Sequence, residues 1–194
     1  MSLNLSFDLD EYRAAAINES PRGKVLVIAA MLDEMLAEIL TQHCIGDMKD
    51  LLDFRGPFGS FGNKISVCYA IGLIDEHTKT ALKLIQNIRN DAAHYEKKKG
   101  RGFDVLFDVT ATEQRVQRLA ECFGFKLDSG NPLFAFEIAG FEIINRIDAA
   151  IEISKTSRQL VKEKIFTVSE FLNESGENDR FHSAWLEIGC TKIP

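Results

Sequence analysis

The sequence predicts an all-α protein, and three features of its 194 residues lead to this prediction. Apolar residues recur at helical spacing over most of the chain. The one segment that alternates like a strand, residues 103–109, has no second strand to pair with. Prolines, which break helix interiors, occur at only four positions: Pro21, Pro57, Pro132 and Pro194. We therefore expect one helical domain over residues 1–194, with its core in residues 20–158.

The N-terminal part predicts a short amphipathic helix over residues 8–18 and then a longer helix. Ser20 has the residue type of an N-cap, and Pro21 suits the first helical position. The long helix is expected to run to Cys44, with one broad apolar face. Three acidic residues lie on its other face, where a solvated role is the simplest interpretation: Asp33, Glu34 and Glu38.

A glycine-rich segment, residues 46–62, ends this helix. Its glycines lack the spacing of a phosphate-binding loop and no strand precedes it, so we expect a structural turn. Residues 61–73 again show helical periodicity. Gly72 can close that helix, and Asp75 can cap the next one.

The following helix is expected from Glu76 to about Glu96, and it contains the segment "IQNIRNDAAHY". Its apolar stripe consists of Ala81, Leu84, Ile85, Ile88 and Ala92. The basic sequence "KKKGRG" comes next. Residues 103–109 are then expected to lie as an extended segment on the helices, and residues 111–123 to form another helix.

Asn131 and Pro132 give a second cap-plus-proline start. We expect a long helix from there to about Ser157 and a last helix over residues 159–173. The tail, residues 174–194, is expected to be irregular and to dock on the body through its apolar side chains.

The composition excludes several functional classes. The net charge of −6 and the pI of about 5.3 are unfavourable for a dedicated duplex binder, so we expect no direct sequence-specific DNA binding. The four cysteines form no CxxC pair, which argues against a zinc site, and we expect no cofactor. The N-terminus lacks the pattern of a signal peptide, and the longest apolar run, residues 25–32, is too short to span a bilayer. These features predict a cytoplasmic protein.

Arg89, Asn90 and His94 form the most informative polar group of the chain. In metal-independent RNA cleavage, His94 would act as general base or acid, and Arg89 would stabilise the charge of the scissile phosphate. Asn90 and His94 share a helix face, but Arg89 and His94 lie about 140° apart around a straight helix. They would converge if the helix frays or tightens near His94, if the long Arg89 side chain wraps round the helix, or across a dimer. Downstream, a basic patch could follow an RNA backbone: Lys97, Lys98, Lys99 and Arg101.

A structural interpretation of the same residues is favoured on the pattern alone. Cations near a helix C-terminus are stabilised by the helix dipole. Arg89 follows the apolar stripe directly, so we expect it to be partly buried and to need acceptors. Three acids on the expected neighbouring helix would supply them: Asp33, Glu34 and Glu38.

Three segments between Arg22 and Tyr95 resemble the MltR-like family, the family of the mannitol operon repressor. They read "RGKVLVIAAMLDEMLAEIL", "LLDFRGPFGSFGNKISVCYAIGLID" and "LKLIQNIRNDAAHY". The matching residues of the second and third segments are Pro57, Gly59, Ser60, Phe61, Ile65, Tyr69, Ala70, Gly72, Leu73, Ile74, Arg89, Asn90, Ala93 and His94. Phe58, Asn63 and Lys64 depart from the commoner residues of that family. The likeness covers somewhat less than half of the chain.

The resemblance implies a bundle similar to HEPN domains, with additional C-terminal helices. It implies a non-enzymatic regulatory or binding protein, a homodimer that represses transcription without a helix-turn-helix, through a protein partner. The alternative is a HEPN-type endoribonuclease that uses Arg89 and His94 to cleave RNA. A purely structural or antitoxin-like partner is the third candidate.

Overall fold

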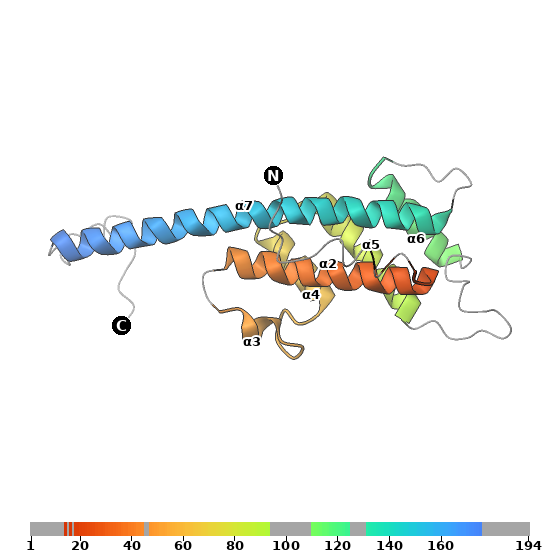
Figure 1. Cartoon of the computed structure of the whole chain (residues 1–194), viewed down its shortest axis with the longest axis horizontal. Coiled ribbons are helices and arrows are strands. Elements are labelled where there is room, and N and C mark those ends of the chain that lie inside the picture. The colour runs from red at the N-terminus through yellow and green to blue at the C-terminus, as the bar shows by residue number, and fades with distance from the viewer. Residues whose placement is uncertain are drawn as a thin grey trace.

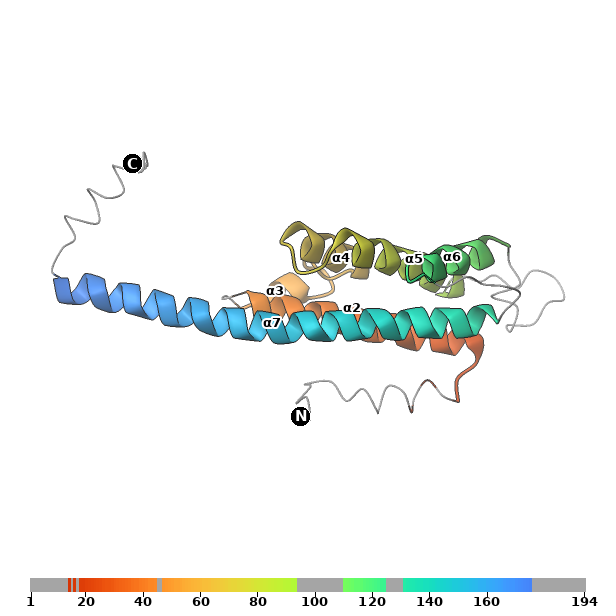
Figure 2. The ribbon, with the colours of Figure 1, turned by 90° about the horizontal axis from the view of Figure 1, so that it is seen from above.

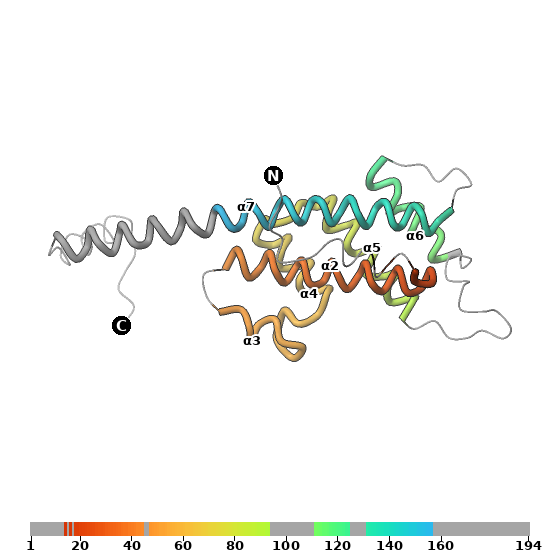
Figure 3. Tube along the Cα trace, viewed as in Figure 1, coloured from red at the N-terminus to blue at the C-terminus, as the bar shows by residue number. Residues whose placement is uncertain are grey.

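The protein is all-α in every part of the chain that the computed structural model describes. These parts are residues 14, 16, 18–44, 47–93, 110–124 and 131–175, with side chains described to residue 156. They contain α2 (Pro21–His43), the four-residue α3 (Lys49–Leu52), α4 (Phe61–Ala70), α5 (Glu76–Ala93), α6 (Thr110–Glu121) and α7 (Pro132–Ser175). Figure 1 labels these helices, and Figure 3 traces the course of the chain. The predicted fold class is therefore confirmed.

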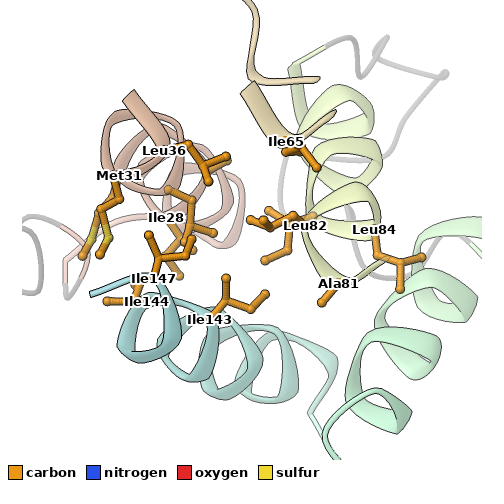
Figure 4. Close-up of a cluster of buried hydrophobic side chains, with 14 of the residues drawn as sticks. Ile28, Met31, Leu36, Ile65, Ala81, Leu82, Leu84, Ile143, Ile144 and Ile147 are labelled. Atoms are coloured by element: carbon orange, nitrogen blue, oxygen red, sulfur yellow. The ribbon is translucent and has the colours of Figure 1, made fainter. Parts of the chain in front are cut away.

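The helices pack in two layers. Figure 2 shows α2 and α7 side by side in one layer and α4, α5 and α6 in the other. The core lies between the layers, where Ile28 of α2, Ile143 of α7 and Leu82 of α5 point toward one another (Figure 4). Leu84 points away from this centre, toward α6. Five helices, α2, α4, α5, α6 and α7, therefore contribute apolar residues to one core, as the periodicity predicts, whereas α3 buries none.

The central helix α2 begins and ends where its sequence predicts. The hydroxyl of Ser20 accepts a hydrogen bond from the backbone N–H of Gly23 (3.1 Å), and Pro21 opens the helix. Cys44 is the C-cap. Nine residues of α2 are buried, because the helix contacts α4, α5 and α7 on different sides. This explains why a simple one-sided amphipathic pattern underestimates its burial.

Helices α2 and α7 run parallel, starting at the same end of the bundle (Figure 1). Lys24 Nζ and Glu137 Oε1 form a salt bridge of 2.7 Å across them. One turn further along, Gly140 of α7 faces Ile28 of α2. A Cβ added to Gly140 would lie 2.9 Å from Ile28 Cγ2, closer than two carbons can pack. Glycine at this position therefore allows the close spacing of the two helices.

The glycine-rich segment is a structural turn, as the sequence predicts. The backbone N–H groups of Gly56 and Phe58 donate to the carbonyl oxygens of Asp53 (2.7 Å) and Leu51 (2.9 Å). Since these amides are used within the turn, they are unavailable to a phosphate.

The turn between α4 and α5 also matches its predicted signals. Gly72 has a left-handed φ of 76°, a conformation that a side chain would strain, and it ends α4. The carboxylate of Asp75 accepts from the backbone N–H of Thr78 at 2.7 Å and so caps α5.

The C-terminal part corrects one prediction. Residues 132–175 form a single helix of 44 residues, whereas two helices meeting near Ser157 were expected. The start is as predicted, since Asn131 Oδ1 accepts from the N–H of Leu133 at 3.0 Å. No glycine or proline occurs between Gly140 and Gly176, and polar residues alone do not break a helix.

The predictions for residues 8–13, 103–109 and 176–194 lie outside the described residues. In the part of the chain that is described, no helix combines the length and the apolar character needed to cross a membrane.

We predict that Gly140→Val destabilises the protein by about 1–3 kcal/mol, because the added atoms force α7 away from Ile28. The matched control is Asn145→Val, at an exposed position of the same helix, which carries the same β-branched residue without the contact. Urea unfolding of both variants measures the difference. If both variants have the same urea midpoint, the close approach of Gly140 to Ile28 does not set the spacing of α2 and α7.

Candidate functional site

The end of α5 places Arg89 at the surface. Ile88 and Ala92 on either side of it are fully buried, but Arg89 itself is exposed. Its Nη1 atom donates to Asn90 Oδ1 at 3.2 Å. The expectation that Arg89 is partly buried is therefore wrong. Its guanidinium faces solvent beside the amide of Asn90.

The physical reason is the position at which α4 begins. Gly62, in the first turn of α4, lies against Gln86, since a Cβ on Gly62 would meet Gln86 Nε2 at 2.5 Å. Helix α4 thus covers the earlier turns of α5 and begins beside Gln86. Arg89 lies almost one turn beyond this point, where α4 no longer shields it.

Two of the three acids predicted to pair with Arg89, Asp33 and Glu38, have other partners. Asp33 forms a 2.7 Å salt bridge with Lys64, whose side chain is only 8% exposed. Glu38 accepts from Gln42 Nε2 at 2.7 Å, one turn along α2. Glu34 is exposed. Asp33 is thus a counter-charge for a buried lysine, a role that the simple solvated interpretation did not include.

Asp91, which the sequence analysis did not single out, joins α5 to α6. Its Oδ2 atom accepts from Thr112 Oγ1 at 3.3 Å and forms a salt bridge with Arg115 Nη1. From the other side, Arg22 Nη2 of α2 donates to the carbonyl oxygen of Ala93 at 3.4 Å. Helices α2 and α6 therefore hold the last turn of α5 through polar contacts.

The structure brings together only part of the predicted polar group. Arg89 and Asn90 are in contact. The other candidates, His94, Lys97, Lys98, Lys99 and Arg101, lie outside the described residues. Convergence of Arg89 with His94, and the basic patch, therefore stay predictions.

The sequence pattern could have indicated that Lys64 and Cys68 are buried. They share the apolar face of α4 with Phe61 and Ile65, a spacing that predicts burial. Lys64 is 7% exposed, and burial raises the pKa of the Cys68 thiol to about 12, so that this thiol stays protonated. Among the described residues, no group of three His, Cys, Asp or Glu side chains could hold a metal ion.

No protein-family model, curated protein or solved structure matches this chain. The likeness of residues 22–95 to the MltR-like family therefore remains a prediction from the three sequence segments.

We predict that Asp91→Asn lowers the free energy of unfolding by about 1 kcal/mol, because Arg115 and Thr112 lose a charged acceptor. Arg89→Gln is the matched comparison, two positions away on the same helix. It should change stability by less than about 0.5 kcal/mol, since Arg89 is exposed. Denaturant titration of both variants separates the two roles. If Arg89→Gln lowers the free energy of unfolding more than Asp91→Asn does, the assignment of Asp91 as the structural residue is contradicted.

Proposed function

We propose that the protein is a non-enzymatic regulatory binding protein of the MltR-like type, which represses transcription through a protein partner. In this proposal it acts in the cytoplasm as a homodimer, needs no cofactor and has no helix-turn-helix. The resemblance of residues 22–95 and the net charge of −6 support it. An acidic protein is poorly suited to hold DNA by its own charge, so a partner would make the DNA contact.

The observation that carries the proposal is the exposure of Phe54, which follows α3. This side chain is 90% exposed, and Leu51 in α3, three residues earlier, is 37% exposed. The turn that presents Phe54 is held internally, by the N–H groups of Arg55, Gly56 and Phe58. An aromatic side chain on a fixed turn loses little conformational entropy when it binds, which is typical of an anchor residue in a protein interface.

Two of the polar groups near Arg89 have structural partners on other helices. Asp91 binds α6, and the carbonyl of Ala93 accepts from Arg22 of α2. These contacts support a binding protein, because they assign the segment a role in packing that needs no catalysis. Fold likeness alone does not decide function.

The exposure of Arg89 supports a second candidate, a HEPN-type metal-independent endoribonuclease. A solvent-facing guanidinium is free to hold a phosphate through its planar fork of donors. In that case His94 would transfer the proton and Arg89 would stabilise the developing charge.

We predict that a protein partner binds the immobilised wild type and is lost from Phe54→Ser. The matched control is Phe134→Ser, which removes a second exposed phenylalanine (60% exposed) and should retain the partner. The wild type, Phe54→Ser and Phe134→Ser are the three immobilised baits. Quantitative mass spectrometry of the proteins that elute from each bait measures the difference. Identical protein sets on all three baits would contradict a contact through Phe54.

For the enzymatic alternative, we predict that the wild type does not cleave single-stranded RNA in the presence of EDTA. Gel analysis of several labelled RNAs tests this, with His94→Ala and Arg89→Gln as controls for contaminating nucleases. EDTA-resistant cleavage that both variants lose would overturn the regulatory proposal in favour of the endoribonuclease.

A further inference from the structure

A cavity of about 300 Å³ lies between the two helical layers, at the turn from α4 to α5. Its lining comprises Leu73, Ile74, Asp75, Thr78, Arg146 and Ala149. Ile74 and Thr78 are buried at its base, whereas Asp75, Arg146 and Ala149 are exposed at its mouth. Ligand sites have volumes of about 300–1,000 Å³, so this half-open cavity lies at the lower limit of that range.

The mouth of the cavity carries a fixed negative charge. The carboxylate of Asp75 caps α5 by accepting from the N–H of Thr78 at 2.7 Å. Hydrogen bonds from the side chain and the backbone of Thr78, together with the nearby Arg146, hold the pKa of Asp75 below its usual range. Asp75 is therefore ionised at neutral pH, and the carboxylate keeps lone pairs for a further donor.

A fixed positive charge lies at the same mouth. Arg146 Nε donates to Glu142 Oε1 at 3.2 Å, and the guanidinium carbon lies 5.2 Å from the centroid of the Phe123 ring. Its Nη1 atom is 3.5 Å from His77 Nδ1, and the His77 ring meets Phe123 edge to face at 5.5 Å. Residues of three helical regions, α5, α7 and the end of α6, thus surround this exposed guanidinium.

The guanidinium keeps donors for a ligand. An arginine has five N–H donors, and within the described part of the chain Nη2 of Arg146 donates to no acceptor. A planar fork of this kind matches a carboxylate. With the Glu142 carboxylate on Arg146, two carboxylates and one guanidinium lie near the mouth, so a simple anion is repelled by Asp75 and Glu142. A ligand that carries both charges is attracted through its ammonium group to Asp75 and through its carboxylate to the Nη2 donors of Arg146.

We propose that this cavity binds a zwitterionic α-amino acid with an apolar side chain. Its carboxylate accepts from Arg146, its ammonium group donates to Asp75, and its side chain lies against Leu73, Ile74 and Ala149. Such a ligand connects the turn before α5 with α7, and so joins the two layers. This site goes beyond the proposed regulatory function and does not depend on the contact through Phe54.

Isothermal titration calorimetry of the full chain with L-leucine, L-valine and L-methionine tests the proposal. At least one should bind, and two analogues of leucine should bind about tenfold more weakly or less: 4-methylpentanoate, which lacks the ammonium group, and 3-methylbutylamine, which lacks the carboxylate. Equal binding of either analogue, or no binding of all three amino acids at millimolar concentration, would overturn the zwitterion site.

Variants locate the site. Arg146→Met keeps the apolar stem, and Asp75→Asn keeps an N-cap of similar strength, so both should fold. Each should weaken binding at least about tenfold, while Arg55→Met, outside the cavity, should bind like the wild type. Thermal melting checks that each variant is folded. Unchanged binding in Arg146→Met or in folded Asp75→Asn would show that the ligand binds elsewhere. Since this assay uses no partner protein or RNA, its result is independent of the tests of the regulatory function.

Discussion

The parallel packing of α2 against α7 is the constraint on which the rest of the bundle depends. The close approach of Gly140 to Ile28 and the salt bridge of Lys24 with Glu137 fix how these two helices lie side by side. With one side of α2 covered in this way, its remaining apolar surface faces α4 and α5. The second layer of helices therefore takes its position from α2, and the core forms between the layers.

Polar contacts then decide which side chains stay available at the surface. Lys64 on the buried face of α4 needs a counter-charge, because a desolvated ammonium group without one is costly, and Asp33 supplies it. Asp91 in turn is engaged by α6. Arg89 lies beyond the start of α4 and has only its neighbour Asn90 as a polar contact within the described residues. The last turns of α5 thus contain residues with different roles. Asp91 is structural, whereas Arg89 faces solvent.

The proposed surfaces lie on different elements of this framework. The turn with Phe54 follows α3, at the edge of the bundle (Figure 1). The cavity lies between the layers at the start of α5, as its lining residues show. A protein contact at Phe54 and a small ligand at Asp75 and Arg146 would therefore not compete for the same residues. Because the ligand would bridge α7 and the α4–α5 turn, it would act on the relative position of the layers rather than on one helix.

The sequence by itself determined the all-α class and the helix starts at Ser20, Asp75 and Asn131. Capping and periodicity depend on residues within one or two turns, so a local pattern is enough to predict them. The adjacency of Arg89 and Asn90 follows from the same local geometry. The prediction of a helix end near Ser157 is wrong, because no helix breaker occurs there and α7 continues to Ser175. Only the tertiary structure decided that Arg89 is exposed, that Asp33 faces Lys64 and that Arg146 meets His77 and Phe123. These relations join residues on different helices, and they depend on where each helix begins along its neighbour, which no local pattern specifies.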